Sequence, residues 1–135
     1  MELTDFKLSL KNENHDSDQI YTDISSTIGL YGSSKMALIL TMSEQSVLVI
    51  SENIMGASLS WEDNLVSDTM GEILNILVGV AQKDSPEKFS FSIPITIKGK
   101  EHEVRVPKKT YTKVTFIFSH EGKENEIALI LVKLK

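Results

Sequence analysis

The feature that most constrains the fold is a predicted helix over residues 66–83, VSDTMGEILNILVGVAQK. Successive helical residues are separated by about 100°, and on that geometry the polar residues fall along one narrow stripe. The stripe contains Asp68, Glu72, Asn75, Gly79 and Gln82. Apolar residues fill most of the remaining wheel, namely Met70, Ile73, Leu74, Ile76, Leu77, Val80 and Ala81. We therefore expect a helix that is mostly buried and shows only this stripe to solvent.

The polar stripe has two interpretations. It could be the ordinary solvent face of a core helix, as most such stripes are, but two features favour a function. Solvated helices usually mix charges of both signs, whereas this stripe contains no lysine or arginine. It also places Asn75 in the middle of the helix, where asparagine has poor helix propensity.

The residue types of the stripe suit the handling of a cation and a water molecule. The Glu72 carboxylate can pair with a cation on a partner, and the Asn75 carboxamide can orient a water because it has both a donor and an acceptor. Such positioning is used where phosphoryl groups are hydrolysed with little covalent chemistry from the protein. Gly79 would allow close approach. Gly71 lies beside the stripe and costs about 1 kcal/mol relative to alanine inside a helix.

Composition narrows the class of protein. A chain of 135 residues is a natural length for one domain, so we expect residues 1–135 to form a single domain. Hydrophobic residues make up 41% and charged residues 24%, which is typical of globular proteins. The absence of cysteine excludes a disulfide framework, a thiolate zinc site and a cysteine nucleophile. The net charge of −5 argues against non-specific nucleic-acid binding.

The sequence contains no signal that points to a membrane or to secretion. No apolar run approaches the roughly 20 residues that a membrane span requires. The N-terminal MELTDFKLSL has neither a basic region nor an apolar region of the kind found in secretory signals. We therefore expect a cytoplasmic protein.

Other candidate sites are weaker than the stripe. His15, His102 and His120 fall in separate predicted loops or turns without ligand spacing, so we expect no metal site. The segment GLYGSSK, residues 29–35, lacks the spacing of a phosphate-binding loop and joins two strands, which favours a hairpin turn. No serine lies in a GxSxG motif.

Basic residues gather in the C-terminal half, but Glu101 and Glu103 interrupt them. The cluster consists of Lys98, Lys100, Arg105, Lys108, Lys109 and Lys113. A solvated sheet face is the favoured interpretation, and a surface for an acidic protein partner is the alternative.

The remaining pattern predicts strands around two principal helices. A first helix is expected to begin at Thr41 or Ser43, to end near Met55 before Gly56, and to turn Val47, Leu48, Ile50 and Ile54 toward the core. Strands are expected at residues 6–10, 20–30, 35–42, 89–97, 101–106, 112–119 and 126–134, with turns at 30–31, 98–100 and 120–125. Pro94 makes the fourth strand an edge or irregular strand. Together the predicted helices and strands indicate an α+β fold with a mostly antiparallel sheet.

The last predicted strand, which contains IALILVKL, is apolar on both faces over much of its length. Such a strand is either central and covered on both sides, or it contacts another subunit.

Three segments together resemble a known family. The spacing of Asp68, Glu72 and Asn75, followed by Gly79, resembles the signature helix of the CheC/CheX/FliY chemotaxis phosphatases. Residues 27–56, TIGLYGSSKMALILTMSEQSVLVISENIMG, resemble the CheX-like order of glycine turn, strand, serine-capped helix and closing glycine. FSIPITIKGKEHEVRVP, residues 91–107, is similar to the Ser-x-Pro strand of the family. The resemblance extends from about residue 24 to the C-terminus.

The resemblance implies a CheX-like fold and a phosphatase that acts on the response regulator CheY. Asn75 would enter the receiver domain of CheY and orient the attacking water, and Glu72 would hold the receiver's active-site lysine in a salt bridge. Asp68 would have a supporting role, and Gly71 and Gly79 would leave clearance for the receiver. The Mg²⁺ ion would belong to the receiver, so no cofactor is expected in this chain. CheX-like proteins form homodimers through their sheets, which residues 127–132 would fit.

The sequence also departs from the family pattern. The helix that commonly precedes the first strand is expected to be missing, and the loop before Pro94 is short. The helix over residues 43–55 lacks Glu-x-x-Asn, so we expect one active site, as in CheX. Two alternatives stay open: a non-catalytic receiver-binding or flagellar-switch-like adaptor, and a dimerisation domain from a larger signalling protein. The pair of Glu72 and Asn75 favours catalysis over both.

Overall fold

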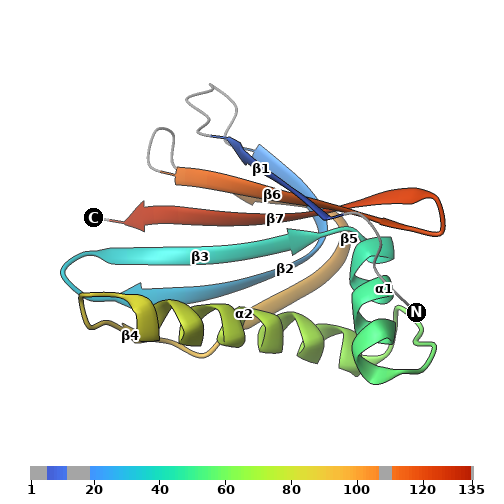
Figure 1. Cartoon of the computed structure of the whole chain (residues 1–135), viewed down its shortest axis with the longest axis horizontal. Helices are drawn as coiled ribbons and strands as arrows, with labels where there is room; N and C mark the ends of the chain where they lie inside the picture. The colour runs from blue at the N-terminus through green and yellow to red at the C-terminus, as the bar shows by residue number, and fades with distance from the viewer. Residues whose placement is uncertain (1–5, 12–18, 107–110, 135) are drawn as a thin grey trace.

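The fold is built on an antiparallel sheet, which Figure 1 shows with two helices against it. The computed structural model describes residues 6–11, 19–106 and 111–134, the first of these ranges by its backbone alone. In the described residues the sheet has seven strands, in the order β1-β6-β7-β3-β2-β4, and β5 pairs with β2. The strands are β1 (Phe6–Lys11), β2 (Gln19–Tyr31), β3 (Lys35–Met42), β4 (Ser90–Phe91), β5 (Ile95–Arg105), β6 (Tyr111–His120) and β7 (Lys123–Leu134). The predicted α+β class is confirmed.

Two helices, α1 (Glu44–Met55) and α2 (Asn64–Asp84), pack on one face of the sheet. In Figure 1, α2 runs along the sheet and α1 stands across one end of it. The core between helices and sheet consists of Ile24, Ile28, Leu40, Met42, Val47, Val66, Met70, Leu74 and Val78, none of them more than 3% exposed. Burying a large apolar side chain contributes about 1.5–3 kcal/mol, so this core fixes α2 firmly against the strands.

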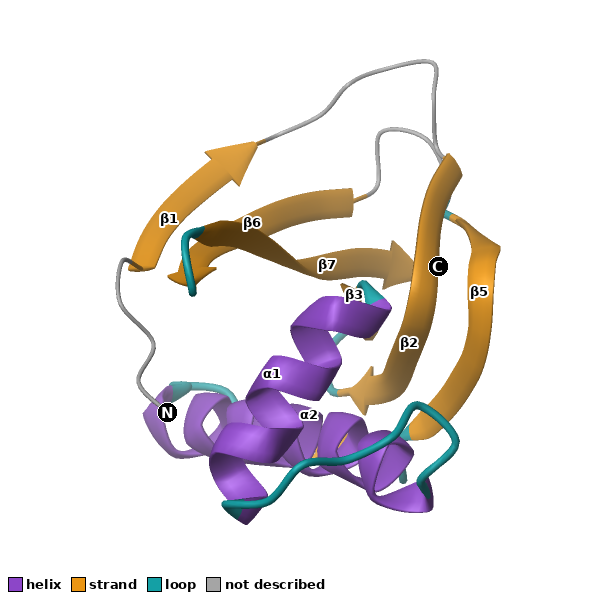
Figure 2. Ribbon diagram, turned by 90° about the vertical axis from the view of Figure 1, so that its right-hand side faces the viewer, coloured by secondary structure: helices purple, strands orange, loops and turns teal. Residues whose placement is uncertain are grey.

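A second apolar cluster lies on the other face of the sheet. It consists of Ile39, Val106, Tyr111, Ile130 and Val132. Figure 2 shows why this face is also buried, because the strands curl along an arc from β1 to β5. Strand β7 lies between β3 and β6, with alternate residues in the two clusters. The strand is therefore central in the sheet, with Leu131 still 36% exposed, and a contact of residues 127–132 with another subunit stays a prediction.

Side chains and glycine cap the helices, and the ends of α1 are those predicted. The Ser43 hydroxyl accepts the backbone N–H of Ser46 at 3.1 Å, and Gly56 ends α1 in the left-handed conformation at φ 71°. The Asp63 carboxylate accepts the N–H of Leu65 at 3.0 Å at the start of α2. One core prediction for α1 is wrong, because Ile54 is 60% exposed in the last turn, beyond the reach of the sheet.

The predicted turn at residues 98–100 is wrong. Strand β5 continues through these residues and bulges outward opposite Asp23 of β2. The Asp23 carboxylate accepts the backbone N–H of Glu101 at 3.0 Å and that of Glu44 at 2.8 Å, so it ties the bulge to the start of α1. Glu101 adopts φ 54° there. The Lys100 ammonium lies 3.1 Å from the Glu44 carboxylate, whose hydrogen bond and charge raise the pKa of Lys100.

Two predicted hairpin turns are displaced. Strand β2 continues to Tyr31, which pairs with Lys35, so the first turn lies at residues 32–34 and not at 30–31. The second turn is Glu121–Gly122 alone, because the ladder between β6 and β7 extends to His120 and Lys123. Glu121 and Gly122 have φ 52° and 76°, the positive values that a type I′ hairpin turn requires.

Candidate active site on the central helix

Helix α2 turns its predicted polar stripe away from the core. Val66, Met70, Leu74 and Val78 lie on its buried side, at most 1% exposed. The opposite side carries Asp68 and Glu72, which are exposed, and Asn75 and Gly79, which are half-buried. The stripe therefore faces outward from a helix whose other side is held by the main core.

One flank of the stripe is bordered by the segment that leads into β5. The Gln82 side chain donates a hydrogen bond to the Phe89 carbonyl at 2.6 Å. A Cβ on Gly71 would lie 3.7 Å from Pro94, an ordinary van der Waals contact. Residues 89–96 therefore run beside α2, as Figure 1 shows near β4. Gly71 faces the chain's own β5 segment, whereas a Cβ on Gly79 would meet open space.

The neighbouring segment is itself anchored to the sheet. The Ser92 backbone N–H donates to the Gly29 carbonyl at 3.0 Å, and the Gly29 N–H donates to the Ser92 hydroxyl at 2.8 Å. The ladder is interrupted here between β4 and β5, where Pro94 has no N–H to donate. The prediction of an irregular edge strand is confirmed, and this strand gives the stripe a fixed border.

The other flank of the stripe is open and apolar. Leu65, Ile76 and Val80 are 38%, 56% and 55% exposed. The prediction that α2 shows only a polar stripe to solvent is therefore wrong. The sheet lies under one side of the helix, and no described residue buries this flank. Leu77 is also partly exposed, because it lines an apolar groove of about 460 Å³ between α2, β3 and β7.

The functional groups of the stripe are available to a partner. Within the described residues, the side chains of Asp68, Glu72 and Asn75 have no hydrogen bond or ion pair. Glu72 and Asn75 are separated by almost one helical turn, so their side chains emerge from one face of the helix. A carboxylate and a carboxamide in this arrangement can engage a cation and a water molecule at the same time.

Sequence comparison identifies the family. The family model for the chemotaxis phosphatase CheX matches residues 24–119. The chain belongs to the CheX family. The matched range contains both helices and the whole polar stripe. A search of curated protein sequences finds no match.

Solved structures show the same CheX-like fold. A CheC-like protein from Shewanella sp. PV-4 is 28% identical, with a TM-score of 0.70 over 97% of this chain and 84% of that one. CheX from Vibrio vulnificus is 25% identical, with a TM-score of 0.71 over 97% of this chain and 86% of that one. A CheX–CheY–BeF3–Mg²⁺ complex from Borrelia burgdorferi is 19% identical, with a TM-score of 0.69 over 100% of this chain and 86% of that one. At this last identity the likeness shows the fold alone.

The histidines of this CheX-family chain do not gather at the stripe. The His102 ring lies 2.9 Å from the Ser25 hydroxyl and 2.6 Å from the Gly99 carbonyl, so it fastens the bulge of β5. His120 lies 3.7 Å from Glu121 in the hairpin turn, and His15 lies outside the described residues. The described ranges contain no group of side chains that could hold a metal ion.

Three of the clustered basic residues have partners within the chain. The Lys98 ammonium donates to the Trp61 carbonyl at 2.7 Å and lies 5.4 Å from the centre of its ring. Lys100 pairs with Glu44, and Arg105 pairs with Glu103. Lys108 and Lys109 lie outside the described residues. Lys98 in particular fixes the connection between α1 and α2, which sets where α2 begins.

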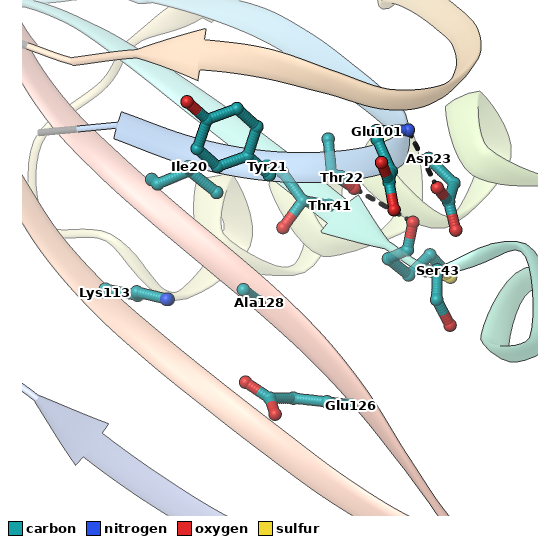
Figure 3. A pocket seen from close by; sticks show the side chains of 11 residues that line it. Ile20, Tyr21, Thr22, Asp23, Thr41, Ser43, Glu101, Lys113, Glu126 and Ala128 are labelled. Carbon is teal, nitrogen blue, oxygen red and sulfur yellow. Dashed lines mark hydrogen bonds between the residues drawn. The ribbon is translucent and has the colours of Figure 1, made fainter.

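A cavity of about 640 Å³ lies apart from the stripe, against strands β2, β3, β5, β6 and β7. It is lined by Ile20, Tyr21, Thr22, Asp23, Thr41, Met42, Ser43, Glu101, Lys113, Glu126 and Ala128. Figure 3 shows Lys113 and Glu126 on one side of it and Tyr21 and Glu101 on the other. Sequence reasoning missed this cavity, because its lining comes from strands far apart in the chain. No residue of α2 contributes to it.

In the part of the chain that the structure describes, neither helix has the length and apolar character that a membrane span requires.

Proposed function

We propose that this CheX-family chain hydrolyses the aspartyl phosphate of a CheY-type receiver domain, in chemotaxis or a related two-component pathway of the cytoplasm. One observation carries the proposal. Glu72 and Asn75 project from the outer face of a helix whose inner residues Val66, Met70, Leu74 and Val78 are buried, and neither functional side chain has a hydrogen bond or ion pair within the described residues. Family membership supplies the expected reaction and the expected class of partner.

The proposed chemistry takes place in the partner's site. Asn75 would enter the receiver and hold a water in line with phosphorus through its carboxamide. The water oxygen forms a bond to phosphorus as the bond to the receiver's aspartyl oxygen breaks, which releases inorganic phosphate and the free carboxylate. Glu72 would pair with the receiver's active-site lysine and so fix the orientation of the two proteins. The Mg²⁺ ion is expected in the receiver, and none is proposed for this chain.

The neighbouring residues of α2 have supporting roles in this proposal. Asp68 lies one turn before Glu72 and adds negative charge where the partner presents a lysine. Gly79 leaves open space one turn after Asn75, which allows the receiver to approach the helix closely. Gly71 lies where residues 94–96 pass beside the stripe, and a Cβ there would make only ordinary contacts with them.

The structural relatives support the class of partner. The CheX from Borrelia burgdorferi was solved in a complex with CheY, BeF3 and Mg²⁺. The fold also resembles FliM in a complex with SpeE from Helicobacter pylori, at 10% identity and a TM-score of 0.57. That likeness is one of fold alone, and the non-catalytic adaptor stays the second candidate. An adaptor has no need of the Glu72 and Asn75 pair, which is why we favour the phosphatase.

The homodimer stays a prediction. Strand β7 is paired along both edges, so a dimer that joins strand to strand would have to use another strand, whereas Leu131 of β7 stays 36% exposed on one face of the sheet. Ile95 and Ile97 on β5 are 69% and 55% exposed and lie on the face away from α2. Light scattering of the purified chain measures this directly, with a single monomeric mass as the result that contradicts it.

The experiment that tests the phosphatase mixes the chain with a CheY-type receiver phosphorylated by phosphoramidate and follows the release of phosphate. We expect the chain to accelerate the release, and we expect Glu72→Ala and Asn75→Ala each to reduce kcat by about 100-fold or more. Matched controls are Glu124→Ala on β7 and Asn53→Ala on α1, which remove the same exposed groups elsewhere. If the receiver binds but all variants release phosphate at the same rate, the adaptor is the correct alternative.

A further inference from the structure

An uncharged apolar strip runs along the open flank of α2. It consists of Leu65, Ile76 and Val80, each between 38% and 56% exposed. On ideal helical geometry Leu65 and Ile76 lie about 60–80° from Asp68, so the strip adjoins the polar stripe. Ile76 and Val80 lie one turn apart, and Leu65 lies about three turns before Ile76 along the same flank. A single exposed apolar side chain is ordinary on a protein surface, but neighbouring ones such as Ile76 and Val80 mark a place where another molecule packs.

A receiver that reaches Asn75 must cover more of this surface than the polar stripe. Specific protein interfaces bury about 800 Å² on each partner, and two polar side chains cannot supply that area. On one side of the stripe the surface continues onto residues 89–96, where Ile93 is 83% exposed. On the other side it continues onto the apolar strip. Any partner centred on Glu72 and Asn75 therefore contacts exposed apolar side chains.

The distribution of charge indicates what kind of partner fits. Asp68 and Glu72 supply negative charge at the centre, and α2 carries no lysine or arginine before Lys83 in its last turn. The surface is therefore acidic in the middle and apolar at its borders. It complements a protein that presents a cation beside its reactive group and apolar side chains around it. A phosphorylated receiver with an active-site lysine meets that description.

We propose that Leu65, Ile76, Val80 and Ile93 form the docking surface for the phosphorylated receiver and determine which receivers this chain accepts. The inference rests on the proposed function and adds to it the side chains that determine the affinity for the receiver. These side chains contribute to binding and not to the hydrolysis itself, because none of them has a group that orients water or pairs with lysine. Removing them should weaken binding and leave the reaction of the bound receiver unchanged.

The test uses the double variant Ile76→Gln with Val80→Gln. Both side chains are more than half exposed, and glutamine is a good helix former, so the variant should fold. The control is Ile54→Gln, which changes a helical side chain of similar exposure, 60%, in the last turn of α1. The probes are a CheY-type receiver activated with beryllium fluoride and Mg²⁺ for Kd, and the same receiver phosphorylated by phosphoramidate for kcat and KM.

We expect the double variant to raise Kd and KM by about tenfold or more with kcat unchanged, and the control to match the wild type. An unchanged Kd and KM in an active protein would overturn the docking surface and leave the phosphatase intact. A fall in kcat without a change in KM would overturn it too, and so would an equal effect of the control. If the wild type binds the activated receiver without releasing phosphate, the proposed phosphatase activity is wrong. The effect of the double variant on Kd then tests the docking surface by itself. If the wild type does neither, both proposals fail.

Discussion

Replacing Gly79 with alanine should stabilise the protein and impair its activity at the same time. Gly79 lies in the interior of α2, and a Cβ at this position would meet no described atom within 4 Å. The added methyl group therefore strains nothing within the chain. It projects from the polar stripe, where the proposed receiver approaches.

The two effects have magnitudes that follow from the structure. Glycine inside a helix costs about 0.5–1 kcal/mol relative to alanine, so the free energy of unfolding should rise within that range. For a chain of 135 residues this corresponds to a rise in Tm of about 2–4 °C. Overpacking a close contact by one methyl group should reduce kcat/KM by about tenfold.

The assay combines thermal unfolding with phosphate release from the phosphorylated receiver. Gly71→Ala is the informative comparison, because its methyl group would contact Pro94 of the chain itself at 3.7 Å. It should stabilise the protein to a similar degree and lose less activity than Gly79→Ala. Full activity in a stabilised Gly79→Ala would refute the close approach of a partner. A lower free energy of unfolding in Gly79→Ala would contradict the finding that a Cβ at this position meets no other atom.

Further substitutions test what holds the site in place. Leu74→Ala should lower the free energy of unfolding by about 2–5 kcal/mol in chemical denaturation, because Leu74 is fully buried between α2 and the sheet. Asp23→Asn should cost about 1–2 kcal/mol and speed hydrogen exchange at the bulge of β5, because an amide oxygen replaces a carboxylate that accepts two backbone N–H groups. Lys98→Met should cost about 1 kcal/mol, because the Trp61 carbonyl loses its donor and the ring its cation, and an unchanged unfolding midpoint would contradict this role.

Local patterns in the sequence predicted most of the elements. The spacing of apolar residues indicated that α2 packs into the core, and the structure places Met70 and Leu74 of that set there. Ser43 and Gly56 marked the ends of α1 because capping depends on the residues at the helix ends themselves. Such signals lie within a few residues of the structure that they determine.

Features that depend on distant contacts could not be predicted in the same way. The bulge of β5 is held by Asp23, which precedes Glu101 by 78 residues, and the glycine between two lysines looked like an ordinary turn. The exposure of Ile76 and Val80 depends on how much of α2 the sheet covers, and periodicity contains no information about the width of a neighbouring element. Both errors concern tertiary structure and not the type of element.

The candidate site was predicted from its residues, but its surroundings were not. Helical geometry indicated that Glu72 and Asn75 share a face, and the polar residues on that face indicated that it meets solvent. It did not indicate that the segment around Ile93 borders the stripe, because the contacts of Gln82 with Phe89 and of Gly71 with Pro94 form only when the sheet assembles. The borders of the site, where partner choice is proposed to lie, therefore required the structure.

The most direct test of the proposed role of Asn75 is the single-turnover rate of phosphate release with Asn75→Ala. The wild type and the variant are each mixed in saturating amounts with the phosphorylated receiver, and binding is measured separately with the receiver activated by beryllium fluoride. We expect Asn75→Ala to bind the receiver activated by beryllium fluoride with a Kd close to that of the wild type. Phosphate release from the phosphorylated receiver should fall to the rate of the receiver alone. Release by the bound variant as fast as by the wild type would contradict the claim that Asn75 positions the attacking water.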